Sequence, residues 1–254
     1  MSDFLEIKNL SHHFAGLKAV SNFNLILKSR EIVGLIGPNG AGKTTVFNLI
    51  SGLHSPTSGE IFFKGTAIHG KKPYLIAEMG IARTFQNIRL FSDMTVIENI
   101  KVAYHYRRKY GLISAFIANK GFRSHEKEIE TAAYDLLSIF GLDKYARRKS
   151  GTLPYGQQRS LEIARALATQ PGLLLLDEPA AGMNISEADQ LLHTIHSLRD
   201  RFGVAILLIE HQMRVVMGVC EHIKVMNFGE AIAEGSPEEI QKNIKVIEAY
   251  LGEE

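Results

Sequence analysis

The chain has 254 residues, with 29 Lys and Arg against 27 Asp and Glu, and a formal net charge of +2. This near balance gives no electrostatic case for a nucleic-acid partner, and no apolar run is long enough to span a membrane. Cys220 is the single cysteine, which excludes an intrachain disulfide. With an N-terminus that lacks the features of a signal peptide, this composition favours a soluble cytoplasmic protein.

The first segment predicts two strands. Residues 4–10 alternate apolar and polar side chains, as a half-buried strand does, and residues 19–27 form a second strand-like run. Phe14 is expected in the loop between them. Two interpretations of Phe14 are open: it is a core aromatic residue, or it is the face on which an adenine ring stacks.

A glycine-rich motif follows the next strand. It fits the spacing G-x-x-x-x-G-K-[ST] of the phosphate-binding P-loop and consists of Gly37, Pro38, Asn39, Gly40, Ala41, Gly42, Lys43, Thr44 and Thr45. Its glycines let the backbone turn with the N–H groups inward and no Cβ in the way of a phosphate. Its lysine can reach the β- and γ-phosphates, and the Thr44 hydroxyl can ligate Mg²⁺.

The flanking residues place this motif between a strand and a helix. Residues 31–36 read as a short buried strand and residues 44–51 as a helix that ends at Gly52, so we expect a nucleotide site. A P-loop by itself leaves kinases, GTPases, motor proteins and transporters open. A GTPase is disfavoured, because the Asn-Lys pair at 119–120 lacks the aspartate of an Asn-Lys-x-Asp guanine reader.

The composition changes in the middle of the chain. Residues 60–64 predict a further strand, and Gln86 follows an apolar stretch at 79–82. From 95 to 149 the pattern is helical and charged, with apolar residues at helical spacing before Gly141. We therefore expect an inserted helical subdomain.

The last part of the chain alternates helices with buried strands. Residues 173–176 and 204–209 are apolar runs typical of parallel strands that are buried on both faces. The first run ends at Asp177-Glu178, and the second ends just before His211. Helices through 161–168 and 186–202, a hairpin over 223–234 and a closing helix from Ser236 are also expected.

The ends of these strands carry the polar residues. In open α/β sheets, ligands bind at the carboxyl ends of parallel strands. The P-loop, Asp177, Glu178 and His211 are therefore expected to converge on one rim of the sheet.

In chain order, these residues resemble the nucleotide-binding subunits of ABC transporters over nearly the whole chain. The matching positions are the A-loop aromatic Phe14, Walker A at 37–45, the Q-loop glutamine Gln86, the signature motif Leu153, Pro154, Tyr155, Gly156 and Gln157, Walker B at 173–177 with the catalytic glutamate Glu178, the D-loop at 180–184, and the switch histidine His211. The resemblance implies an α/β P-loop NTPase fold with a RecA-like core, a mixed sheet, an antiparallel β subdomain and an inserted α-helical subdomain.

It also implies one ABC ATPase domain over residues 1–254. Residues 1–86 and 156–254 would form the catalytic core with the β subdomain, and residues 87–155 the helical subdomain that carries the signature motif. The activity implied is ATP hydrolysis coupled to transport, with ATP and Mg²⁺ as cofactors.

The resemblance assigns a role to each motif. Asp177 would hold Mg²⁺ through water, with Thr44 and Gln86 completing the shell. Glu178 would polarise the attacking water, and His211 would hold the γ-phosphate. The signature motif would cover the ATP of a second subunit, so that an ATP-driven dimer opens on hydrolysis and moves membrane subunits.

Three positions depart from the commonest family pattern. Pro154 and Tyr155 replace the serine and a glycine of Leu-Ser-Gly-Gly-Gln, and Asn184 replaces the usual aspartate of the D-loop. These changes affect the segments that would act on the opposite subunit's site. The segments at 155–159, 161–165, 179–184 and 249–254 and the long insertion near 104–122 resemble the ATPases of branched-chain amino-acid importers of the LivG type.

That subfamily implies an assembly. The subunit would work at the cytoplasmic face of the inner membrane, as a peripheral protein, with a second ABC ATPase in a homo- or heterodimer, two permease subunits and, indirectly, an external solute-binding protein. A heterodimer would tolerate an asymmetric signature better than a homodimer. The alternative is the ATPase of a lipid or lipopolysaccharide exporter. A non-transport ABC protein acting on DNA or ribosomes is disfavoured, because neither a coiled-coil insertion nor a second ATPase half is present.

Overall fold

The computed structural model describes residues 4–107 and 120–251, and the chain divides into two compact units. Unit 1 consists of Met1–Arg83 and Gly172–Glu254, and unit 2 of Thr84–Pro171. The insertion near 104–122, one of the segments that carried the resemblance, lies largely outside the described residues.

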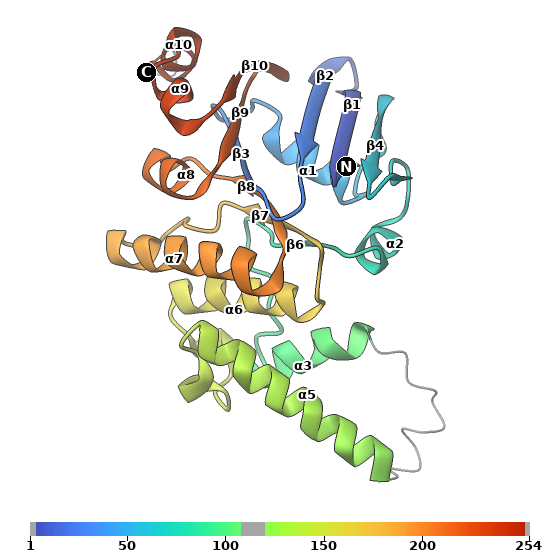
Figure 1. Cartoon of the computed structure of the whole chain (residues 1–254), viewed down its shortest axis with the longest axis vertical. Coiled ribbons are helices and arrows are strands. Elements are labelled where there is room, and N and C mark those ends of the chain that lie inside the picture. Colours follow the sequence, from blue (N-terminus) through green and yellow to red (C-terminus); the bar gives the residue numbers. More distant parts are fainter. Residues whose placement is uncertain (1–3, 108–119, 252–254) are drawn as a thin grey trace. The chain divides into compact units, whose positions relative to one another are not determined.

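A four-stranded antiparallel sheet, in the order β2-β1-β4-β5, opens unit 1 (Figure 1). Its strands are β1 (Leu5–Phe14), β2 (Leu17–Leu27), β4 (Ser58–Phe63) and β5 (Thr66–Ala67). The turn between β1 and β2 is Ala15-Gly16, and both residues have positive φ, as two-residue hairpin turns prefer. Phe14 therefore ends a strand, paired with Leu17. The expectation that Phe14 lies in a loop is wrong, because the tight turn leaves only two residues between the strands.

A six-stranded mixed sheet forms the rest of the strand framework, in the order β10-β9-β3-β8-β7-β6. Its strands are β3 (Ile32–Ile36), β6 (Ile81–Arg83), β7 (Leu173–Asp177), β8 (Ala205–Ile209), β9 (His222–Asn227) and β10 (Glu230–Gly235). All pairs are parallel except the β9–β10 hairpin. Every residue of β3, β7 and β8 is buried, as the continuous apolar runs predicted.

The two faces of β3 contact different layers. Val33 and Leu35 join the hydrophobic core formed with α1 (Lys43–Ile50) and the antiparallel sheet. On the opposite face, Gly34 packs against α8 (Met213–Val219) and Cys220, whose Sγ would lie 2.8 Å from a Cβ at this position. Burial raises the pKa of the Cys220 thiol to about 12, so this cysteine is a neutral core residue. The remaining helices of unit 1 are α2 (Pro73–Glu78), α7 (Ile185–Phe202), α9 (Pro237–Gln241) and α10 (Ile244–Leu251).

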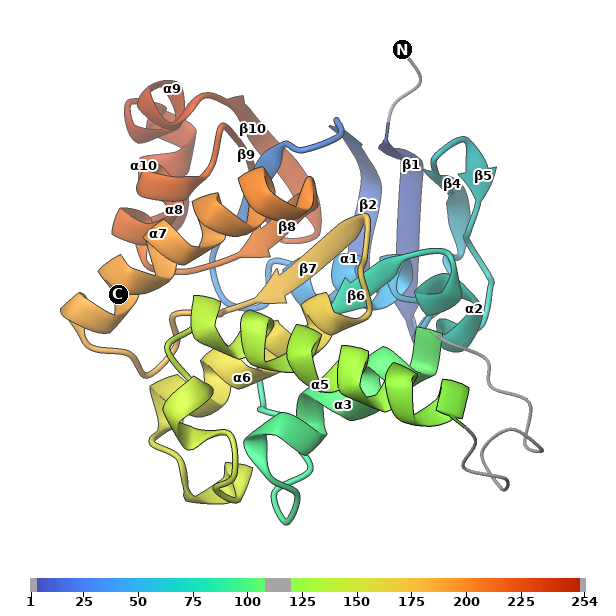
Figure 2. The same ribbon diagram turned by 60° about the horizontal axis from the view of Figure 1, so that its bottom comes forward.

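Unit 2 is helical, as the composition predicted. Among the described residues of unit 2 are the helices α3 (Val96–Arg107), α5 (Lys120–Ile139) and α6 (Tyr155–Ala168), which Figure 2 labels, and short 3₁₀ turns at Asp143–Tyr145 and Ser150–Thr152. Asn99 is fully buried and ties the loops of this unit together, because its Nδ2 donates to the Phe91 and Thr95 carbonyls and to Ser150 Oγ. Within the described residues, no helix is long and apolar enough to cross a bilayer.

The boundaries of unit 2 differ from the division expected at residues 87 and 155. The helix α6 contacts α3 and α5, so the whole of it belongs to unit 2, and Gln86 belongs there as well. The division expected from the sequence cuts through the signature motif after Tyr155, whereas the compact unit keeps the motif together with the whole of α6.

Candidate functional site

The P-loop joins the end of β3 to the start of α1. The helix begins at Lys43, and its N-cap residue is Gly42, which provides no side-chain hydrogen bond. The first N–H groups of α1 therefore have no side-chain cap, which is the arrangement that binds phosphate at a helix N-terminus.

Two glycines are required by neighbouring strands rather than by a ligand. Gly37 has φ 144°, and a Cβ there would stand 2.0 Å from the Met226 carbonyl oxygen of β9. Gly42 has φ 99°, and its Cβ would stand 2.3 Å from the Ala19 carbonyl oxygen of β2. From the sequence, we explained these glycines by the space that a phosphate needs. The structure adds that they let the loop lie directly against two strands.

Lys43 lies folded over its own loop. Its Nζ donates to the Gly37 carbonyl at 2.6 Å and to the Pro38 carbonyl at 2.7 Å, and the residue is 5% exposed. The ammonium group is thus held at the loop that would bind the phosphates. This placement agrees with the expected role of a fixed positive charge.

The polar residues predicted for the rim lie at the ends of adjacent strands. β3, β8 and β7 are consecutive in the sheet, as Figure 1 shows, and their registers pair Leu35 with Ile209 and Asp177 with Ile209. The P-loop, His211 and Glu178 follow these ends directly. Convergence on one rim is therefore confirmed for these parts of unit 1.

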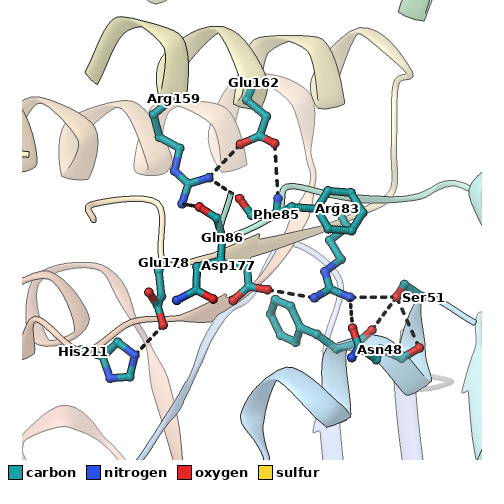
Figure 3. A network of polar contacts seen from close by, with 11 residues as sticks. Asn48, Ser51, Arg83, Phe85, Gln86, Arg159, Glu162, Asp177, Glu178 and His211 are labelled. Atoms are coloured by element: carbon teal, nitrogen blue, oxygen red, sulfur yellow. Dashed lines mark hydrogen bonds and ion pairs between the residues drawn. The ribbon is translucent and has the colours of Figure 1, made fainter. Parts of the chain in front are cut away.

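Asp177 is held by an arginine that the sequence did not single out. Its Oδ2 lies 2.9 Å from Arg83 Nη2, and the two side chains are 2% and 7% exposed (Figure 3). Arg83 Nη1 donates to Asn48 Oδ1 of α1 at 2.8 Å and to Oγ of Ser51, the C-cap residue of that helix, at 3.1 Å. No sequence motif marks Arg83, because its partners are 32 to 94 residues away.

Glu178 and His211 contact each other across the strand ends. His211 Nε2 lies 2.5 Å from Glu178 Oε1 (Figure 3). Glu178 has φ 49°, a left-handed conformation that a non-glycine residue adopts only at a cost, and its N–H bonds the Ile209 carbonyl at the end of β8. This strained backbone directs the carboxylate toward the histidine, so the two proposed catalytic groups are in direct reach of one another.

Glu210 is a second residue that the sequence did not assign. It is 2% exposed, and its carboxylate accepts from the N–H groups of Ala180 at 2.7 Å, His211 at 3.0 Å and Gln212 at 3.3 Å. Burial raises the pKa of this carboxyl, although the three N–H groups oppose that shift. Glu210 thereby ties the D-loop to the backbone of the switch histidine. In the sequence, Glu210 could have been singled out as an acidic residue that directly follows an apolar strand.

In unit 2, a buried ion pair on α6 holds the backbone around Gln86. Arg159 Nη1 pairs with Glu162 Oε2 at 2.8 Å and also donates to the Phe85 carbonyl, and Arg159 Nη2 donates to the Gln86 carbonyl at 3.2 Å (Figure 3). Glu162 Oε1 accepts from the N–H groups of Phe85 and Arg89. The signal in the sequence was a pair of opposite charges three residues apart within an apolar helix.

The signature residues open α6. Pro154 is the N-cap without a side-chain hydrogen bond, Tyr155 is the first helical residue and is 47% exposed, and Leu153 is buried. The first turn of α6 thus also lacks a side-chain cap, like that of α1. This geometry is compatible with an anion at the N-terminus, as the resemblance implies.

Two further predicted residues have clear local partners. Phe14 is 41% exposed and packs edge-on against His12 and His54, with ring centroids 4.5 and 5.3 Å away; burial lowers the pKa of His12. Asn184 is the N-cap of α7, where its Oδ1 accepts from the Glu187 N–H and the Glu187 carboxylate accepts from the Asn184 N–H. Asparagine therefore serves as a helix cap at this D-loop position. The adenine role of Phe14 stays a prediction.

These residues fit a nucleotide and a magnesium ion. Nothing lies within 4 Å of the position that a Gly40 Cβ would take, so the crest of the loop is open. Thr44 is exposed in the first turn of α1, and Asp177 ends a neighbouring strand of the same unit. A hydroxyl and a carboxylate are donors that Mg²⁺ prefers. Gln86, the third expected metal residue, belongs to unit 2 and is exposed there.

Comparison with known proteins gives consistent results. The family model described as ABC transporter matches residues 20–181, and the model described as branched-chain amino acid ATP-binding cassette transporter matches residues 232–254. The high-affinity branched-chain amino acid transport ATP-binding proteins LivG of Escherichia coli strain K12 and BraF of Pseudomonas aeruginosa are 49% and 47% identical, each over 98% of both chains. The crystal structure of the ADP conformation of an ATP-binding cassette of an ABC transporter is similar, with TM-score 0.85 and 30% identity over 99% of this chain and 100% of that chain.

Proposed function

Because the chain belongs to the ATP-binding cassette family of ABC transporters, we propose that it powers an importer of branched-chain or other hydrophobic amino acids. The observation that carries this proposal is 49% identity to LivG over 98% of both chains. The match of residues 232–254 to the branched-chain amino-acid cassette model favours the importer over the lipid-export alternative.

The side chains of the rim support a division of labour in ATP hydrolysis. Lys43 and the first N–H groups of α1 bind the phosphates, and Thr44 and Asp177 would hold Mg²⁺, which when bound would neutralise charge on the phosphate oxygens. Glu178 orients and polarises the attacking water. His211, which contacts Glu178 at 2.5 Å, keeps that carboxylate in place and bonds the γ-phosphate.

The proposed assembly follows from the signature segment. The signature segment from Leu153 to Gln157 covers the ATP of a second cassette, and the pair of cassettes drives two permease subunits at the cytoplasmic face of the cell membrane, supplied by an external solute-binding protein. The uncapped first turn of α6 supports this role.

The test is transport by the reconstituted complex. The chain, expressed with its co-encoded membrane subunits, partner cassette and binding protein in proteoliposomes, is expected to take up leucine, isoleucine or valine only when ATP is present. Glu178→Gln should retain ATP binding and reduce uptake and turnover by about 10²-fold or more, because it removes the group that activates water. Absence of ATP-dependent uptake of any hydrophobic amino acid, with lipid extraction instead, would overturn the import function in favour of export.

A further inference from the structure

Arg83 joins the helix of the P-loop to the strand that carries Asp177. It is the last residue of β6, which pairs in parallel with β7 and sets Arg83 opposite Leu175. From there its guanidinium pairs with Asp177 Oδ2 at 2.9 Å through one nitrogen (Figure 3). Through the other nitrogen it bonds Asn48 of α1 at 2.8 Å and Ser51, the C-cap residue of α1, at 3.1 Å.

The two partners are aligned with the expected metal ligand on α1. Asn48 is four residues after Thr44 and shares a face of the helix with it, and Ser51, three residues after Asn48, is the C-cap residue that continues this face. The planar guanidinium group of Arg83 therefore holds the Asp177 carboxylate beside the face of α1 on which Thr44 lies.

This contact requires an arginine. The guanidinium is planar and offers several N–H groups in a fixed fork, whereas a lysine offers one point charge on a flexible stem. The pair is nearly fully buried, with Arg83 also lying 5.5 Å over the Phe47 ring, so its geometry is set by packing on every side. A cation placed beside a carboxylate that holds a metal repels that metal, so a favourable effect of Arg83 on metal binding has to come from orientation of the carboxylate.

We propose that Arg83 is a positioning residue for the magnesium site: it orients Asp177 relative to Thr44 and thereby sets the Mg²⁺ requirement of nucleotide binding and hydrolysis. This inference rests on the proposed ATPase function. In this role Arg83 acts through Asp177, with which it forms its ion pair.

The experiment measures ADP affinity by calorimetry, first in EDTA and then across a series of Mg²⁺ concentrations. Arg83→Ala is expected to raise the half-saturating Mg²⁺ concentration by about 10- to 100-fold, the usual effect of losing a group that orients a metal ligand. The affinity for ADP in EDTA reports on the P-loop alone and serves as the reference. Arg83→Lys should recover only part of the loss, and Asn48→Ala, which keeps the ion pair, should give a smaller shift in the same direction.

A matched control is Arg199→Ala. Arg199 also lies between two carboxylates, those of Asp200 and Glu221. Glu221 directly precedes β9 and therefore lies at the amino ends of the parallel strands, away from the rim that carries the site. This variant should leave the Mg²⁺ requirement unchanged.

Three outcomes would overturn the proposal. A lower Mg²⁺ requirement in Arg83→Ala would show that Arg83 masks Asp177. An equal loss of ADP affinity with and without Mg²⁺ would show a purely structural role. If Arg83→Ala does not fold, an unchanged Mg²⁺ requirement in both Arg83→Lys and Asn48→Ala would show that Arg83 does not position the metal site. Failure of the unaltered protein to bind ADP would instead refute the proposed function.

Discussion

Glu210 illustrates how a single buried carboxylate can organise two functional loops. It accepts three backbone N–H groups, from Ala180 on one loop and from His211 and Gln212 on the other. Gln212 adds a return contact, because its Nε2 donates to the Ala180 carbonyl at 3.2 Å. These hydrogen bonds connect the D-loop to the loop of the switch histidine, so a displacement of one loop displaces the other.

The raised pKa of Glu210 predicts a specific pH dependence. Because the folded-state pKa lies above the ordinary value of 4.5, the contribution of Glu210 to stability is complete below that value and is lost as pH rises through the folded pKa. Glu210→Gln cannot titrate. The free energy of unfolding of the native protein, measured by urea titration between pH 4.5 and 8, should therefore fall relative to that of the variant as pH rises. A difference between the two proteins that stays constant with pH would contradict this prediction.

At the residue scale, the sequence predicted the residues whose type and spacing follow from phosphate and metal chemistry, including Lys43, Asp177 and Glu178. It did not predict residues whose role depends on contacts formed only in the folded chain. Arg83 was not identified, because its partners lie 32 to 94 positions away and no local pattern of the chain encodes such contacts. Glu210 follows an apolar strand directly, but its contact with Ala180, 30 positions away, could not be read from the sequence.

The element α6 combines two duties in unit 2. Its first turn carries the signature residues, and its interior carries the fully buried Arg159, whose guanidinium bonds the Phe85 and Gln86 carbonyls. A displacement of this helix therefore moves the backbone at Gln86 with it. We infer that the signature motif and the Q-loop glutamine respond as one body in unit 2.

This coupling predicts a large stability effect for Arg159→Met. Removing one partner of a buried ion pair leaves Glu162 uncompensated and should lower the free energy of unfolding by about 3 kcal/mol or more. The double variant Arg159→Met with Glu162→Leu should regain part of that loss, since no charge then remains buried. Urea denaturation measures both. Faster hydrogen exchange of the Phe85 and Arg89 amides in the double variant would support the anchoring of the Q-loop backbone, and unchanged exchange would refute it.

Elements were predictable from the sequence in proportion to their length and burial. The fully buried strands β7 and β8 and the 18-residue helix α7 follow from pattern alone, whereas the capping role of Asn184 was found only in the structure. The three residues of β6 and the six of α2 are too short to show a period, and only pairing with β7 makes β6 a strand. Because Arg83 ends β6, its ion pair with Asp177 could not be predicted from the sequence either.

At the scale of the whole molecule, the unusual signature bears on how two cassettes would share work. Pro154 lacks the hydroxyl that the common serine offers, and the exposed ring of Tyr155 stands where the common motif has glycine. In a heterodimer, the site covered by this chain's signature and the site covered by the partner's would then hydrolyse ATP at different rates. A homodimer of this chain would have two weakened sites.

Restoring the common residues tests this asymmetry. The double variant Pro154→Ser with Tyr155→Gly, assayed as isolated chain at high concentration, is expected to raise ATP turnover by roughly tenfold or more, because one added hydrogen bond to a charged phosphate is worth about 1.5–3 kcal/mol. Serine also caps helices better than proline, so a stability gain must be separated from a catalytic one. Lys72→Ser is the matched control, since Lys72 is the N-cap of α2 without a side-chain hydrogen bond and lies outside the site. A higher melting temperature in both variants with turnover unchanged in both would show that position 154 acts only as a cap, and the asymmetry would need another origin.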